Sequence, residues 1–167
     1  IAKGFARSMS PGIFLPDAPE VFRTGGTPQD PPALPHLRPS KPGHFDIALE
    51  VGVKTQAMSR PQIVCRSNTK HLYWSIAQQI AHQASNGTAL EIGDLYASGT
   101  ISGEGEDSYG SLLELTWRGE RDVILEETGE PLSFLQDGDE VSMSAYAQGP
   151  GYRIGFGDVV GRILPSP

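Results

Sequence analysis

Apolar residues occupy every second position from 45 to 53, and the positions between them are mostly polar or small. A period of two places one set of side chains on one face of a strand, so this pattern predicts a half-buried β-strand over 45–54. A second short strand is predicted over 61–66. Apolar residues at 72, 73, 76, 77, 80 and 84 have instead the spacing of an amphipathic helix, with a cap in 67–69 and a stop at Asn86-Gly87.

Beyond this helix the pattern predicts short strands separated by glycine-containing turns, over 90–97, 112–117, 123–125, 141–147, 152–156 and 159–164. One helix among many strands predicts an α+β domain that is mostly β, built as a sandwich or a closed roll.

The N-terminal part of the chain has a different character. Residues 1–42 hold nine of the fourteen prolines, so they form neither a long helix nor a central strand. We expect a short strand over 12–15 and then an extended surface path to Pro42. Two interpretations of 25–42 stay open, a linker without chemistry and an arm that lies across a partner.

Composition narrows the class of protein. With 167 residues, 38% of them hydrophobic and 20% charged, the chain is long enough for one domain with one core. A net charge of -7 argues against a nucleic-acid partner, and no apolar run reaches the roughly 18 residues of a membrane helix. The single cysteine, Cys65, has no internal disulfide partner, which fits a reducing compartment such as the cytoplasm.

The strongest candidate for a site is the glycine-rich stretch 96–117. Glycines at 99, 103, 105 and 110 let a backbone approach a ligand closely, and loops between strands often carry function. In the predicted strand 112–117, Glu114 is the one interior charge and points away from its apolar neighbours. It is either a solvated acid or a carboxylate that orients a base beside a cavity. The nearby acids could hold a divalent ion or form a solvated loop: Glu104, Glu106 and Asp107.

A set of short motifs in this chain resembles the fumarylacetoacetase family. The motifs are Ser-Gly-Thr-Ile-Ser-Gly at 98–103, Gly-Ser-Leu-Leu-Glu-Leu-Thr-Trp at 110–117, and family-like segments at 67–68, 72–74, 93–95, 137–141 and 152–157. The segment 1–11 resembles the family's lysine-containing segment, and Gln78-Gln79 also matches. The motifs follow the family's order, and together they cover residues 1–163 apart from variable loops. Shorter relatives, the acylpyruvate hydrolases and hydroxymuconate isomerases, usually have a Thr-Gly-Thr-Pro turn at the first motif. This chain has Ser-Gly-Thr-Ile at that place, which favours the fumarylacetoacetases over the shorter relatives.

The resemblance implies a fold and an activity. The fold is the mixed β-sandwich or roll of the family's C-terminal catalytic domain, with a proline-rich extended segment at 1–42 and a β-rich body at 43–167. The activity is hydrolysis of fumarylacetoacetate to fumarate and acetoacetate, the last step of tyrosine and phenylalanine breakdown, by a cytoplasmic homodimer. Two alternatives stay open, a related diketo-acid hydrolase or decarboxylase and a non-catalytic β-domain that dimerises.

The start of the chain carries a further expectation. It opens without methionine and inside a family motif. We therefore expect the N-terminal domain and the beginning of the catalytic domain to be missing, and we expect the 167-residue chain alone to be inactive.

The resemblance also assigns site residues. Lys3 and Glu114 fall on catalytic positions and Thr100 on a substrate-binding position. Lys3 would stabilise developing negative charge, Thr100 would bond a substrate carboxylate, and Glu114 would fix the tautomer of a base histidine. These roles follow from the family motifs and not from spacing alone.

Metal ions enter through the same resemblance. The family's calcium ligands lie upstream of residue 1, and the position of Lys3 belongs to a second, magnesium-type site. At that site Arg7 stands where the family has a threonine. An arginine has no lone pair to give and stays charged, so we expect its guanidinium to replace the magnesium ion.

Overall fold

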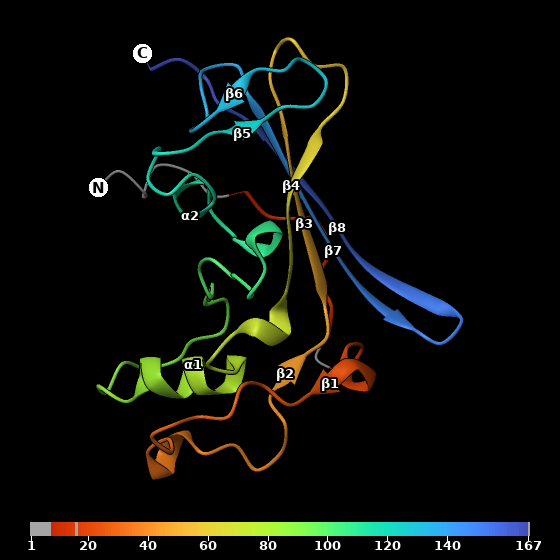
Figure 1. Ribbon diagram of the computed structural model, residues 1–167. Coiled ribbons are helices and arrows are strands. Elements are labelled where there is room, and N and C mark those ends of the chain that lie inside the picture. The colour runs from red at the N-terminus through yellow and green to blue at the C-terminus, as the bar shows by residue number, and fades with distance from the viewer. Residues whose placement is uncertain (1–7, 16, 167) are drawn as a thin grey trace.

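The centre of the computed structural model, which describes residues 8–15 and 17–166, is a twisted antiparallel sheet (Figure 1). Two hairpins build it, and they pair through their inner strands in the order β4-β3-β7-β8. Ala48 lies opposite Tyr146 and Lys54 opposite Glu140. The strands are β3 (Ala48–Lys54), β4 (Gln62–Asn68), β7 (Glu140–Gly149) and β8 (Tyr152–Arg162).

The segment between the two hairpins covers one side of this sheet, and the tip of the β7–β8 hairpin extends away from it (Figure 1). Most of the segment is irregular, since its elements are short and joined by loops. It contains η3 (Thr69–His71), α1 (Ile76–Ala84), η4 (Glu106–Ser108), α2 (Leu112–Leu115), and the paired strands β5 (Val123–Ile124) and β6 (Pro131–Leu132).

The best-buried apolar cluster of the described residues lies where β3 meets the β5–β6 ribbon. Leu125 is 1% exposed and Val53 is 2% exposed, and Met58 and Leu132 complete the cluster. Leu112, the first residue of α2, packs against it. The short helix is therefore tied to the core at its start.

The proline-rich path packs on the body of the same chain. It contains η1 (Glu20–Phe22), β1 (Arg23–Thr24), η2 (Pro35–Leu37) and β2 (His44–Phe45), and β1 pairs with β2. The side-chain amide of Gln78 on α1 donates to the carbonyl of Leu37 at 2.9 Å and to the side chain of Gln29 at 2.9 Å. Residues 25–42 are thus anchored along α1, and are not a free linker.

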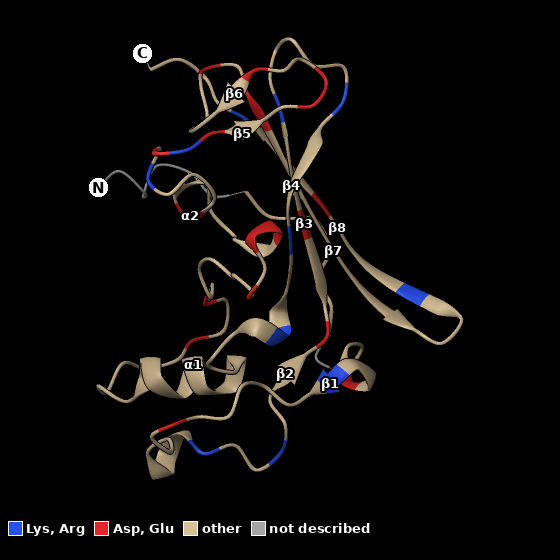
Figure 2. Cartoon of the chain, in the orientation of Figure 1, with Lys and Arg blue, Asp and Glu red and all other residues tan. Residues whose placement is uncertain are grey.

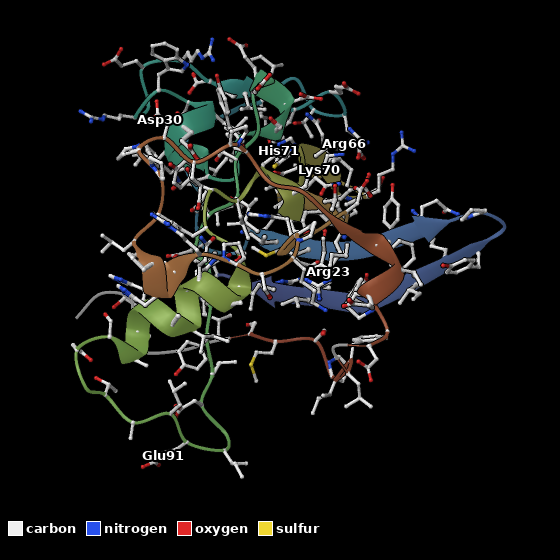
Figure 3. The ribbon with its side chains drawn as sticks, turned by 90° about the horizontal axis from the view of Figure 1, so that it is seen from below. Arg23, Asp30, Arg66, Lys70, His71 and Glu91 are labelled. Atoms are coloured by element: carbon white, nitrogen blue, oxygen red, sulfur yellow. The ribbon has the colours of Figure 1, made fainter. Side chains whose placement is uncertain are left out.

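An exposed ion cluster holds the beginning of this path. Arg23, labelled in Figure 3, donates to the carboxylate of Glu20 and to the carbonyl of Pro42, and lies over the ring of Phe45. The hydrogen bonds from Arg23 and then Lys41 lower the pKa of Glu20 to about 2. Because the pKa is lowered in the folded state, the cluster stabilises the fold above the ordinary carboxyl pKa. That contribution is lost as the pH falls toward 2.

The predicted class, α+β and mostly β, is confirmed. The predicted strand 45–54 is β2 and β3 with a break at Asp46, whose N–H bonds Phe22 instead of a sheet neighbour. The two predicted strands 152–156 and 159–164 are one strand, β8. Helix α1 begins a turn later than predicted because Ser75 and Gln78 cap it reciprocally, while Asn68 caps η3.

Three predicted strands are wrong. Residues 112–117 begin as helix α2 because the Ser111 side chain accepts from the N–H of Glu114. Residues 90–97 form a turn in which the Glu91 N–H donates to Asp94 and Gly93 has φ +101°. This loop lies at the periphery, where Figure 3 labels Glu91. Residues 12–15 have no partner strand among the described residues.

Candidate functional site

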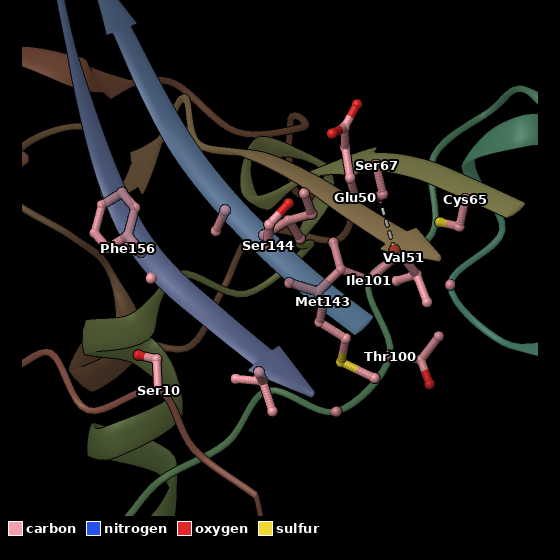
Figure 4. A pocket seen from close by; sticks show the side chains of 16 residues that line it. Ser10, Glu50, Val51, Cys65, Ser67, Thr100, Ile101, Met143, Ser144 and Phe156 are labelled. Carbon is pink, nitrogen blue, oxygen red and sulfur yellow. Dashed lines mark hydrogen bonds between the residues drawn. The ribbon is translucent and has the colours of Figure 1, made fainter. Parts of the chain in front are cut away.

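Thr100 lies on an exposed loop at the edge of a cavity of about 430 Å³ between that loop and the sheet (Figure 4). The sheet side of the cavity is mostly apolar, and it includes Leu49, Val51, Met143, Phe156 and Val159. Gly99 and Gly110 complete the loop side.

This cavity carries little charge. Its one charged lining residue among those described is Glu50, which pairs with Arg66 at 3.2 Å and points away from Thr100 in Figure 4. An anionic substrate requires cationic or N–H partners, and an apolar wall supplies none. Among the described residues the cavity thus offers an apolar wall, with the hydroxyl of Thr100 as a polar group at its edge.

Cys65 also lines the cavity, but it is unsuited to nucleophilic chemistry. It is 4% exposed. Burial raises the pKa of its thiol, and the negative charges of Asp107 and Glu114 raise it further. Since the thiolate is the reactive form, the thiol is inert near neutral pH.

Glu114 lies on α2 beside the cavity and is not part of its lining. Its carboxylate accepts a hydrogen bond from the Ser102 hydroxyl, 2.9 Å from both oxygens, and another from the Ser111 hydroxyl at 2.8 Å. Its expected place in a strand over 112–117 is wrong, because residues 112–115 form helix α2 and Glu114 is exposed on it. The carboxylate is nevertheless held in place by two side chains.

The backbone around Thr100 is held from two directions. The hydroxyl of Ser67 on β4, which is 8% exposed, donates to the carbonyl of Ile101 at 2.7 Å, as the dashed line in Figure 4 shows. On the other side, a Cβ on Gly110 would lie 2.8 Å from the Thr100 methyl and 2.7 Å from the Ile101 oxygen. Only glycine fits this close approach, so the loop position of Thr100 is well defined.

Lys3 and Arg7 lie outside the described residues, and their predicted roles stay predictions. The described residues that follow them lie against β8. The rings of Phe14 and Phe156 are 4.8 Å apart, and a Cβ on Gly157 would lie 3.4 Å from the Cβ of Ser10. Strand β8 thereby contacts residues of the described segment 8–15.

Gly157→Ala is expected to destabilise the fold by about 1–2 kcal/mol, because its φ of +78° is unfavourable for any residue with a Cβ. The strand has an extra residue here, since Ser144 faces Asp158 while Tyr146 faces Gly155. Urea denaturation measures the loss. Gly155→Ala is the matched control, because a Cβ added at Gly155 would meet open space. A loss as large as that of Gly157→Ala would show that the positive φ at this β-bulge is not the cause.

Metal binding finds no support in the described part of the chain, 8–15 and 17–166. No three His, Cys, Asp or Glu side chains there are grouped to hold an ion. In the acidic loop Glu106 pairs with Arg121 at 3.4 Å. The calcium ion that the resemblance implies has its expected ligands upstream of residue 1, so calcium binding stays a prediction.

Sequence reasoning missed the three serines that hold this site. Ser111 had a readable signal, since Ser-x-x-Glu at 111–114 is the pattern of a helix cap. Ser67 and Ser102 had none, because each bonds a residue far along the chain.

Comparison with known proteins gives consistent matches along the chain. A family model described as "Fumarylacetoacetate (FAA) hydrolase C-terminal" matches residues 2–164. Fumarylacetoacetase of Mus musculus is 45% identical over 166 residues, which cover 99% of this chain and 39% of that protein. The Homo sapiens and Arabidopsis thaliana fumarylacetoacetases are each 44% identical, over 99% and 100% of this chain and 39% of their own lengths. The chain thus spans 39% of these curated relatives.

Proposed function

Because the chain belongs to the fumarylacetoacetate hydrolase family, we propose that it forms part of the active site of a hydrolase that cleaves fumarylacetoacetate to fumarate and acetoacetate. The observation that carries this proposal is the arrangement of two residues with family roles. Thr100 borders the cavity, and the carboxylate of Glu114 is bonded to Ser102 of the same loop. The identity to fumarylacetoacetases over nearly the whole chain supports the same reaction.

In this proposal each residue acts on a different part of the reaction. A base takes a proton from water, the water oxygen adds to the ketone carbon, and the carbon–carbon bond breaks to release a carbanion that is then protonated. Glu114 holds the base, a histidine by the resemblance, in the correct tautomer and stabilises its protonated form. Thr100 donates to a substrate carboxylate, and Lys3 stabilises the developing negative charge.

Metal ions stay outside this mechanism. Calcium is proposed from the resemblance alone, and no step above passes through it. The expectation that Arg7 replaces a magnesium ion beside Lys3 is likewise a proposal from the sequence.

Thr100→Val is expected to weaken substrate binding in the whole protein by ~1–3 kcal/mol, the usual cost of losing a partner of a charged group. The valine has a similar shape, so KM should rise while kcat changes little. Steady-state kinetics with fumarylacetoacetate measures both constants. Thr88→Val, at another exposed threonine upstream, is the control, and unchanged constants in Thr100→Val would assign Thr100 a structural role.

We also propose the homodimer and the cytoplasmic location that the resemblance implies. No helix in the described ranges is long and apolar enough to cross a membrane. Acidic and basic residues are scattered over strands and loops (Figure 2), and the net charge is -7. This distribution supports a small-molecule substrate more than a nucleic acid.

A further inference from the structure

Ser102 connects the two segments to which the proposed function assigns roles. It lies two residues after Thr100, on the loop that borders the cavity, while Glu114 lies on α2. Its hydroxyl donates to the Glu114 carboxylate, at 2.9 Å from each oxygen. No other side chain in the described ranges links this loop to Glu114 by a hydrogen bond.

The same hydroxyl also closes the base of the intervening loop. The N–H of Gly110 donates to the Ser102 oxygen at 3.1 Å, so this oxygen accepts one hydrogen bond and donates another. Gly110 in turn packs directly on Thr100 and Ile101. A movement of Ser102 would therefore shift Glu114 and the cavity edge together.

The two serines on Glu114 have different functions. Ser111 caps α2 through the N–H of Glu114, so it fixes the carboxylate only relative to its own helix. Ser102 fixes it relative to the Thr100 loop. A carboxylate has about four lone-pair sites, and these two hydroxyls leave sites free on its exposed side for an imidazole N–H.

We propose that Ser102 is a positioning residue for the carbon–carbon bond hydrolysis, because it sets the Glu114 carboxylate at a fixed distance from Thr100. The role rests on the proposed function, since it acts through the residue that orients the base. Catalytic groups must be held within a fraction of an ångström, and partners that orient a functional side chain typically contribute about 10- to 100-fold.

The decisive test is a kinetic comparison in the whole protein that carries this chain. Ser102→Ala is expected to lower kcat by roughly 10- to 100-fold and to change KM by less than about 2-fold. Ser102→Thr keeps a hydroxyl and should restore most of the rate. Ser98→Ala is the matched control, because Ser98 is an exposed serine of the same stretch that bonds only its neighbour Gly99.

A double substitution separates positioning from general stability. If Ser102 acts through Glu114, Ser102→Ala should add little to the kinetic loss of Glu114→Gln. Full multiplication of the two losses, or a kcat for Ser102→Ala equal to that of Ser98→Ala, would overturn the proposal.

Amide hydrogen exchange gives a readout that does not depend on activity. Ser102→Ala should speed the exchange of the Gly110 amide, which donates to the Ser102 hydroxyl, and Ser102→Thr should not. Unchanged exchange in Ser102→Ala would contradict the hydrogen bond between Gly110 and Ser102, and with it the proposed positioning role. The unsubstituted whole protein could instead fail to cleave fumarylacetoacetate while Ser102 still protects the Gly110 amide. That result would reject the proposed function, and with it the catalytic role of Ser102, but not the hydrogen bond itself.

Discussion

Glu114→Gln is expected to lower the kcat of the whole protein by roughly 10²- to 10⁴-fold, the range that general acid–base catalysis contributes. Glutamine has nearly the same shape and still accepts hydrogen bonds from Ser102 and Ser111. It loses the negative charge that stabilises a protonated imidazole, and its amide can present a donor where an acceptor is needed. Because Glu114 does not line the cavity, KM should stay nearly constant.

The control for this prediction is Glu104→Gln, which removes an exposed acid from the adjacent loop. It should leave kcat and KM unchanged. Steady-state kinetics and thermal unfolding of both variants separate the two interpretations of Glu114. A loss of thermal stability without a loss of kcat would show that Glu114 is a solvated acid that stabilises α2 and has no part in catalysis.

Leu125→Ala is expected to destabilise the fold by about 2–5 kcal/mol, the usual cost of a large-to-small change in a packed core. The side chain is 1% exposed and lies in one cluster with Val53, Met58 and Leu132. These contacts join the β5–β6 ribbon to the sheet. The void that alanine leaves can therefore collapse only if the ribbon and the sheet both move.

Urea denaturation of Leu125→Ala measures this loss directly. Leu90→Ala is the matched control, since Leu90 is 49% exposed in a surface loop and its loss should stay below about 1 kcal/mol. Equal losses in the two variants would contradict a core centred on Leu125.

The sheet could be predicted from the sequence because its strands follow a period of two. Six of the strands fall within or near predicted ranges, among them β3, β4 and β7. The break before β3 could not be predicted, because the N–H of Asp46 bonds Phe22 from a distant turn. Local pattern carries no information about such a partner.

The site could be predicted only in part. Family motifs predicted Thr100 and Glu114 as site residues, and the structure places them on segments that Ser102 links by a hydrogen bond. Their roles stay predictions. Residues 112–117 were predicted as a strand because Leu113, Leu115 and Trp117 alternate with polar residues. The cap at Ser111 outweighs that short alternation, since it satisfies the first free N–H groups of a helix.

Periodicity and composition in this chain were sufficient for the class of fold, the main strands and one helix, since these depend on which side chains repeat on one face. The motifs were sufficient for the family. The hydrogen bonds from Ser67 to Ile101 and from Ser102 to Glu114 were decided by the tertiary structure. Bonds between residues distant in sequence produce no periodic pattern along the chain. The same holds for the anchoring of the proline-rich path, where Gln78 reaches Leu37 only after α1 has packed on it.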